Sequence, residues 1–222
     1  MYYFKNYKIR IAWFICFMIV SATIYYDVFA TTYKCTGMYR SDVEFGIAYY
    51  GPDLFHSYKG YTPNTLYNQT ISQWIYEMNH SRVLFMHTHG APGRITLDNS
   101  NTMLSALYMS SISYSSVPRM VYLSACECGK NSPIYGNIGN TLVNKGVGCV
   151  VAFEEEIRYP IGHPESGCNL YDLKTINYLT HYNYTIHNAS LAAESDIIDL
   201  LGWAYGCDSR IIYGNSYMKF VC

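Results

Sequence analysis

Two apolar segments decide the fold class: Val83-Leu84-Phe85-Met86-His87-Thr88-His89-Gly90 and Met120-Val121-Tyr122-Leu123-Ser124-Ala125-Cys126. Their apolar residues are consecutive rather than alternating, which is typical of strands that are covered on both faces. Between such runs the chain places apolar residues at helical spacing, for example at Ile71, Trp74, Ile75 and Met78. Strands that alternate with helices predict a three-layer α/β/α fold around a mostly parallel central sheet.

Further elements are expected outside these segments. Apolar and β-branched runs predict strands at Val43–Tyr50, Val147–Phe153 and Arg210–Tyr213. Apolar residues at helical spacing predict helices around residues 71–78, 103–107, 137–145, 170–176 and 197–204. Gly146 is expected to end the third of these helices, and Ser190 is a candidate cap for the last. No repeat or linker divides residues 31–222, so a single domain is expected there.

The composition fits one globular domain and excludes one class of partner. The chain has 222 residues, of which 50% are hydrophobic and 14% charged, so it can bury a substantial core. Lys and Arg number 15 against 16 Asp and Glu, which gives a net charge of −1 at pH 7. A general nucleic-acid binder carries an excess of basic residues, so no nucleic-acid partner is expected.

The first thirty residues have the pattern of a secretory signal peptide. Lys5, Lys8 and Arg10 precede an uncharged stretch at residues 11–26, and the small-residue pattern of Val28-Phe29-Ala30 follows. A spanning helix needs roughly 20 apolar residues, so cleavage after Ala30 is the expected fate of this segment. If it is not cleaved, residues 11–26 attach the protein to a membrane. The sequence therefore predicts a secreted or extracellular protein.

The cysteines bear on the same prediction. Eight are present, and Cys16 lies in the apolar stretch that cleavage would remove. The seven that remain are an odd number, so at least one thiol of an exported protein lies outside intramolecular disulfides. Cys149, inside an apolar run, is expected to be a buried thiol, whereas Cys126 stands at a strand end where a free thiol has a chemical use.

The two deciding segments both end in residues that carry chemistry. In a parallel sheet the reactive groups collect at the carboxyl ends of the strands. His89 and Cys126 therefore meet at one edge of the sheet, as a base and a thiol nucleophile would. Gly90 leaves room for a substrate backbone, and its N–H can stabilise a developing oxyanion.

These motifs resemble those of the caspase-like cysteine peptidases, in particular the CHAT and gingipain-type domains. The resemblance rests on a strand ending in His89-Gly90, on the segment Ser124-Ala125-Cys126 separated by two residues from Gly129, and on the glycine-rich turn and strand within residues 139–153. Residues 211–220 are similar to the closing segment of that family. The resemblance covers residues 83–158 best.

The family resemblance carries implications for fold and chemistry. It implies a caspase-like peptidase domain over residues 31–222, with Cys126 as nucleophile and His89 acting mainly on the leaving group. It also implies an oxyanion hole from backbone N–H groups of Gly90 and Cys126. Such an enzyme cleaves protein or peptide substrates through a thioester and uses no metal or organic cofactor.

Other interpretations of the same residues stay open at this point. His89 could be a buried core histidine, and Cys126 could be half of a disulfide. His87, His89, Cys126 and Cys128 could together bind zinc, since alternate strand residues share a face. The same fold could also serve as a catalytically inactive interaction or surface module.

The acidic triplet Glu154-Glu155-Glu156 is the remaining candidate site feature. It follows the strand at residues 147–153, so it can be a solvated strand end or can supply a carboxylate to the substrate cleft. A carboxylate there would favour cleavage after Arg or Lys, because guanidinium–carboxylate pairs are strong and specific. If the strand continued, Glu154 and Glu156 would share one side and Glu155 the other.

Overall fold

The two apolar segments form the centre of a six-stranded sheet in the computed structural model, which describes residues 33–43, 46–158, 167–202 and 204–220. The sheet order is β2-β1-β3-β7-β8-β9. The strands are β1 (Lys34–Tyr39), β2 (Thr62–Tyr67), β3 (Val83–His87), β7 (Met120–Ser124), β8 (Cys149–Phe153) and β9 (Arg210–Gly214). All neighbours pair in parallel except β9, which is antiparallel to β8.

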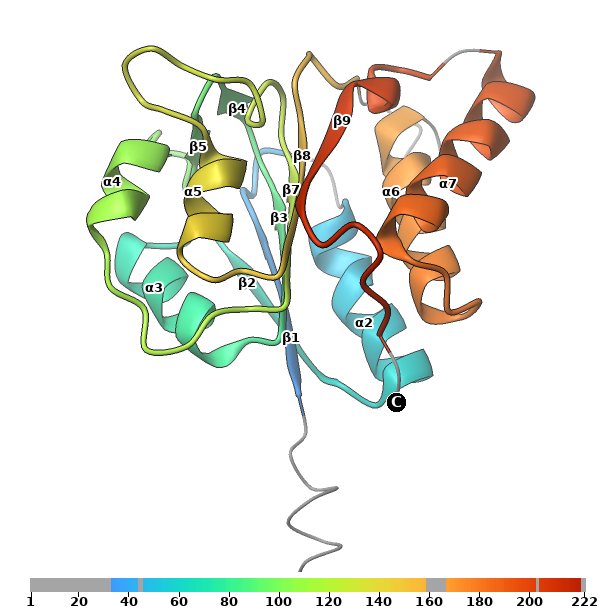
Figure 1. Cartoon of the computed structure of the whole chain (residues 1–222), viewed down its shortest axis with the longest axis horizontal. Coiled ribbons are helices and arrows are strands. Elements are labelled where there is room, and N and C mark those ends of the chain that lie inside the picture. The colour runs from blue at the N-terminus through green and yellow to red at the C-terminus, as the bar shows by residue number, and fades with distance from the viewer. Residues whose placement is uncertain (1–32, 44–45, 159–166, 203, 221–222) are drawn as a thin grey trace, which may run out of the picture. The chain divides into compact units, whose positions relative to one another are not determined.

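Helices cover both faces of this sheet (Figure 1). One face carries α3 (Ile71–His80), α4 (Ala106–Ser111) and α5 (Ile138–Asn144). The other carries α2 (Ile47–Lys59), α6 (Gly167–Thr180) and α7 (Ile186–Leu201). Within β3, Val83 and Phe85 belong to one core and Leu84 and Met86 to the other. The predicted three-layer α/β/α fold with a mostly parallel sheet is thereby confirmed.

A second, smaller sheet follows the end of β3. It consists of β4 (Gly90–Ala91), β5 (Arg94–Thr96) and β6 (Met103–Ser105), which pair antiparallel. A short 3-10 helix, η1 (Cys207–Ser209), precedes β9 on the opposite side of the central strands. The small sheet follows the carboxyl end of β3, and η1 leads into β9 beside the carboxyl end of β8, where Phe153 pairs with Arg210.

Most elements predicted around the site are confirmed, including β3, β7, β8 and β9 and the helices α3, α5, α6 and α7. The strand predicted at Val43–Tyr50 is wrong, because α2 begins at Ile47. The sheet instead uses β1, which contains Gly37. A Cβ on Gly37 would lie 1.5 Å from the carbonyl oxygen of Ala48, so only glycine lets α2 pack this closely on β1.

Two helix starts differ from the prediction because polar caps outweigh apolar spacing, and one strand was missed. Residues 103–105 form β6, and α4 starts only after Ser105, whose side chain accepts a hydrogen bond from the N–H of Tyr108. The cap of α7 is Thr185, whereas Ser190 is buried inside that helix. The edge strand β2 was not predicted, because most of its residues are polar or exposed.

The predictions for the N-terminal segment fall outside the described residues. These are the signal peptide at residues 1–30, the alternative membrane attachment through residues 11–26, and the loss of Cys16. Across the part of the chain that the structure describes, no helix is long and apolar enough to cross a membrane.

Candidate active site

The register of β3 and β7 brings the two predicted catalytic residues to one place. His87 pairs with Ser124, so His89 and Cys126 each follow two residues beyond a matched pair. The N–H of Thr88 donates to the carbonyl of Ser124 at 3.2 Å. A Cβ on Gly90 would lie 2.3 Å from the carbonyl oxygen of Cys126. The backbones of Gly90 and Cys126 therefore lie side by side, as the sequence predicts.

Cys126 carries a free, half-buried thiol. Its Sγ lies 3.5 Å from the carbonyl oxygen of Ile157. Burial raises the pKa of this thiol, and the negative charge of Glu156 raises the pKa further, against the opposing effect of a backbone hydrogen bond at Ile157. The resting thiol is therefore protonated at neutral pH, and a base must remove its proton before it can attack.

His89 is an exposed histidine with a carboxylate neighbour. Its side chain is 59% exposed, which does not fit the alternative of a buried core histidine, and its Nε2 lies 3.8 Å from Oδ2 of Asp42. Asp42 is fixed by Arg40, whose Nε and Nη2 donate to the two carboxylate oxygens at 2.8 and 2.5 Å. These bonds lower the pKa of Asp42, so the carboxylate stays charged beside the imidazole.

Asp42 is a site residue that the sequence analysis missed. It follows β1, and β1 was not among the predicted strands. Recognising β1 would have placed Asp42 at the same sheet edge as His89, because β1 and β3 are parallel neighbours.

The thiol of Cys126 and the imidazole of His89 follow the ends of adjacent strands, but they are not hydrogen-bonded to each other. Throughout the described residues, no hydrogen bond joins Sγ of Cys126 to the ring of His89. Catalytic contacts are often loose in the absence of substrate, so this separation is compatible with a catalytic pair that closes on binding.

The backbone N–H of Gly90 is suitably placed for an oxyanion. The N–H of Thr96 donates to the carbonyl of His89, so the next pair along the β4–β5 ladder, Gly90 with Ile95, is a non-hydrogen-bonded pair. The N–H of Gly90 is therefore directed away from β5. Directly after Cys126, Glu127 has a φ of 50°, a left-handed conformation that few non-glycine residues adopt. Such strain concentrates at functional turns.

The zinc alternative finds no ligand set. His87 and Cys128 are buried, and Sγ of Cys128 lies 3.7 Å from the carbonyl oxygen of Leu123. Over the described ranges, no three His, Cys, Asp or Glu side chains gather where they could hold a metal ion.

The acidic triplet lies just beyond β8, which ends at Phe153, so strand alternation does not extend to it. All three side chains are exposed. Burial raises the pKa of Tyr213, and the charge of Glu154 raises it further against a hydrogen bond from Asn137. The charge of Glu156 raises the pKa of the Cys126 thiol. Glu155 supports the nucleophile turn through its backbone, since its carbonyl accepts from the N–H of Glu127 at 3.0 Å. Of the triplet, Glu156 is the carboxylate associated with the thiol.

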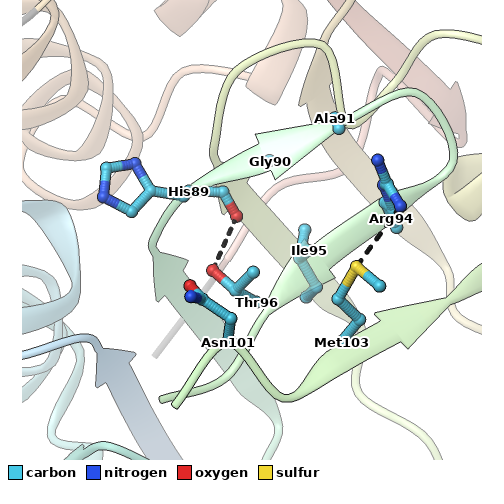
Figure 2. Close-up of a pocket in the computed structure, with 8 residues that line it drawn as sticks. All are labelled: His89, Gly90, Ala91, Arg94, Ile95, Thr96, Asn101 and Met103. Atoms are coloured by element: carbon cyan, nitrogen blue, oxygen red, sulfur yellow. Dashed lines mark hydrogen bonds between the residues drawn. The ribbon is translucent and has the colours of Figure 1, made fainter. Parts of the chain in front are cut away.

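A hollow of about 260 Å³ adjoins His89 on the small sheet. Figure 2 shows it between the β4–β5 hairpin and the start of β6, with the imidazole at one end and the side chains of Arg94 and Met103 at the other. Sequence analysis did not identify this pocket, because it depends on the register of three short strands.

The fold and site together define a three-layer α/β/α protein with a thiol and an imidazole at adjacent strand ends. Searches of protein-family models and of curated proteins gave no match to the sequence. A solved structure described as "Structure of Protease" is similar, with a TM-score of 0.55 and 11% sequence identity. The match covers 85% of this chain and 48% of that one, so this chain spans about half the length of its neighbour. At this identity the likeness concerns the fold.

Proposed function

We propose that this protein is an exported cysteine endopeptidase of the caspase-like class, with Cys126 as nucleophile and His89 as its partner. The observation that carries the proposal is the matched register of β3 and β7, which puts these two residues at adjacent strand ends, where the backbone of Gly90 packs against the carbonyl of Cys126. The structural neighbour described as a protease supports a peptidase on the same fold.

The proposed reaction uses groups of this chain alone. His89 takes the proton of the Cys126 thiol, and the thiolate attacks the carbonyl carbon of the scissile bond. The N–H groups of Gly90 and Cys126 donate to the oxyanion. The C–N bond then breaks, His89 protonates the departing amine, and a thioester remains. A water molecule that gives its proton to His89 hydrolyses the thioester, and the thiol is restored. No step draws on a metal or an organic cofactor.

Asp42 acts in this proposal as a positioning residue. Its charged carboxylate lies 3.8 Å from Nε2 of His89 and favours the imidazolium that forms when the thiol loses its proton. Arg40 holds that carboxylate in place, because its almost wholly buried side chain donates a hydrogen bond to it. Substrate binding must bring the imidazole toward Cys126 for the transfer.

Glu156 supports a preference for Arg or Lys before the scissile bond. Its carboxylate lies close enough to Cys126 to raise the pKa of the thiol. A cationic substrate side chain bound there would neutralise that charge and lower the thiol pKa, so binding and activation would be coupled. Glu154 and Glu155 serve as comparison positions, because neither carboxylate is associated with the thiol.

The test is cleavage of a fluorogenic peptide library by the full chain and by its Cys126→Ala and His89→Ala variants. We expect cleavage after Arg or Lys, and a loss of at least about 100-fold in kcat/KM in each variant. Cys128→Ala is the matched control, since that neighbouring thiol is buried and should leave kcat/KM nearly unchanged. Full activity in Cys126→Ala, or a preference for Asp that is indifferent to Glu156→Gln, would contradict the proposal.

A non-catalytic interaction module is the second candidate function. It is favoured by the protonated thiol and by the missing hydrogen bond between Cys126 and His89. A thiol-directed probe separates the two candidates. Labelling of the folded protein at Cys126 that is lost in His89→Ala supports the enzyme, whereas labelling only after unfolding supports the module. N-terminal sequencing of protein recovered outside the producing cells tests export and cleavage after Ala30.

A further inference from the structure

Arg94 is a cation that pairs with no carboxylate of the described residues. Its Nη1 lies 3.3 Å from Sδ of Met103 and 3.5 Å from the hydroxyl of Tyr135, and its guanidinium carbon lies 5.0 Å from the centre of the Tyr135 ring. Within the described residues no Asp or Glu pairs with it, whereas Arg40 and Arg210 each bind a carboxylate. A ring and a thioether hold the guanidinium in place but leave most of its five N–H donors unused.

The pocket around Arg94 offers further donors rather than acceptors. Nη1 of Arg40 donates at 2.9 Å both to Oδ1 of Asn101 and to Oγ1 of Thr96. The oxygen of Asn101 is therefore occupied, and its NH₂ group is the part left for a ligand. Two acidic residues lie in this part of the molecule, and both are engaged: Asp98 accepts from the N–H and the hydroxyl of Thr102, and Asp42 beside His89 is paired with Arg40. The unfilled hydrogen-bonding capacity of the pocket suits an anion.

The pocket lies on the same face as the His89 side chain. Thr96 is opposite His89 in the ladder and Met103 is opposite Thr96, so all three point to one side of the small sheet, together with Arg94. Figure 2 shows the imidazole at one end of this row and Arg94 at the other. A ligand in the hollow would therefore extend away from His89 along the hairpin.

The chemistry of His89 decides which half of a substrate lies there. In the proposed reaction His89 protonates the departing amine, so the chain on the C-terminal side of the scissile bond leaves past the imidazole. Glu156, in contrast, follows β8, and its charge acts on the Cys126 thiol. The Arg94 pocket consequently faces the residues that follow the cleaved bond, and Glu156 faces the residue that precedes it.

We propose that the Arg94 pocket is a specificity site for an Asp or Glu side chain located one or two residues after the scissile bond. A carboxylate there can accept two parallel N–H bonds from the guanidinium and a third from Asn101. The inference rests on the proposed peptidase function for its orientation, and it goes beyond that function by assigning a second, oppositely charged subsite. The preferred substrate then carries Arg or Lys before the bond and an acidic residue after it.

The test measures binding and cleavage with the same peptides. The probes are N-acetylated, C-amidated hexapeptides with Arg before the bond and either Asp or Asn, or either Glu or Gln, at one of the first two positions after it. Binding to the full-length Cys126→Ala protein is measured by calorimetry. We expect the acidic member of one pair to bind about 10-fold more tightly than its amide. The same ratio is expected in kcat/KM of the unmodified protein.

Matched variants assign the effect to the pocket. Arg94→Gln should reduce the acid-to-amide ratio to about one, and Arg94→Lys should retain only part of it because a lysine cannot bind bidentately. Arg119→Gln is the control, because Arg119 also lies over an aromatic ring, Phe220, but precedes β7 at the opposite edge of the sheet. It should keep the full ratio, and thermal melting should show that all variants fold.

The outcomes separate this inference from the proposed function. Equal binding of acidic and neutral peptides, or a ratio that survives Arg94→Gln, overturns the inference even if the peptides are cleaved. Discrimination that depends on Arg94 without any cleavage supports the pocket and contradicts the peptidase. A further peptide, neutral in its side chains but ending in a free carboxylate after the same position, distinguishes a side-chain site from a C-terminal one. Tighter binding of that peptide alone would also overturn the inference.

Discussion

At the scale of single residues, the candidate site depends on a backbone approach as much as on side chains. Gly90 is where β3 turns into β4, and the carbonyl of Cys126 occupies the space that any Cβ would need. The packing of the two strand ends therefore requires glycine at this position, and in the proposed reaction the N–H of the same residue donates to a substrate oxygen.

We expect Gly90→Ala to affect stability and activity together. A Cβ placed 2.3 Å from a backbone oxygen must push the ends of β3 and β7 apart, at a cost of about 1–3 kcal/mol in the free energy of unfolding. Activity should fall by more than this cost predicts, because the shift also moves the N–H of Gly90. Urea unfolding and kcat/KM measure the two effects. The control is Ala91→Gly, which adds no Cβ beside the carbonyl of Cys126 and should change neither the stability nor the activity strongly. A fully active Gly90→Ala would remove Gly90 from the proposed oxyanion hole.

The positions of His89 and Cys126 at adjacent strand ends could be predicted from the sequence, but their surroundings could not. A histidine and a cysteine that end two fully apolar strands must share a sheet edge if the strands are parallel neighbours. Asp42 and Arg94 carry no such signal. Asp42 follows a strand interrupted by Gly37, and the role of Arg94 depends on which residues face it across β6. Tertiary register, not local pattern, decides both positions.

At the scale of elements, those with a continuous apolar run could be predicted from the sequence, and those without one could not. Strands β3, β7 and β8 are buried at every position, so their apolar runs are unambiguous. Helix α2 contains Gly51 and Pro52, which are poor helix formers, and Gly51 is needed because a Cβ there would lie 2.8 Å from the ring of Phe85. Packing against the sheet overrides propensity in that helix.

Strand β1 is joined to α3 by a buried polar cluster around Glu77. Its carboxylate accepts from Nζ of Lys34 at 2.7 Å, from the hydroxyl of Thr36 at 2.8 Å and from that of Ser81 at 2.7 Å. We expect Glu77→Ala to lower the free energy of unfolding by about 3 kcal/mol, since it leaves these donors without their acceptor. Chemical denaturation measures this loss.

The control for this prediction is Lys174→Ala. Lys174 forms an ion pair with Asp196 at 2.7 Å, but both side chains are about one-third exposed. Its removal should cost less than about 1 kcal/mol. Equal losses in Glu77→Ala and Lys174→Ala would mean that the buried cluster contributes no more to stability than a surface pair does.

At the scale of the whole molecule, two buried groups link folding to pH from opposite directions. Asp172 on α6 accepts hydrogen bonds from the hydroxyls of Tyr122, at 2.6 Å, and Ser124. Burial raises the pKa of this carboxyl to about 7, although both hydrogen bonds act to lower it. His87 lies on β3 and pairs with Ser124 in the sheet. Burial lowers the pKa of His87 to about 4, and the positive charge of His89 lowers the pKa further. Tyr171 and Cys207 are the other titratable groups beside Asp172.

The signs of the two linkages follow from which state holds the extra proton. For Asp172 the folded state binds a proton more tightly than the unfolded state, whose pKa is 3.8, so its stabilising effect is complete below about pH 4 and is lost as the pH rises to 7. For His87 the unfolded state, with a pKa of 6.5, binds the proton more tightly, so stability is lost as the pH falls from 6.5 to 4. At 1.36 kcal/mol per pKa unit the two effects amount to roughly 4 and 3 kcal/mol, and they nearly cancel.

Single substitutions should therefore expose slopes that the intact protein conceals. Relative to the unmodified chain, the stability of Asp172→Asn should increase with pH between about 4 and 7, because the loss of stability that Asp172 causes over this range is absent from the variant. His87→Gln should show the opposite trend over about pH 4 to 6.5. Urea unfolding at half-unit pH intervals measures both differences, and other titrating groups cancel in the subtraction. Parallel curves for the two variants and the unmodified chain would show that neither group changes its protonation between the folded and unfolded states.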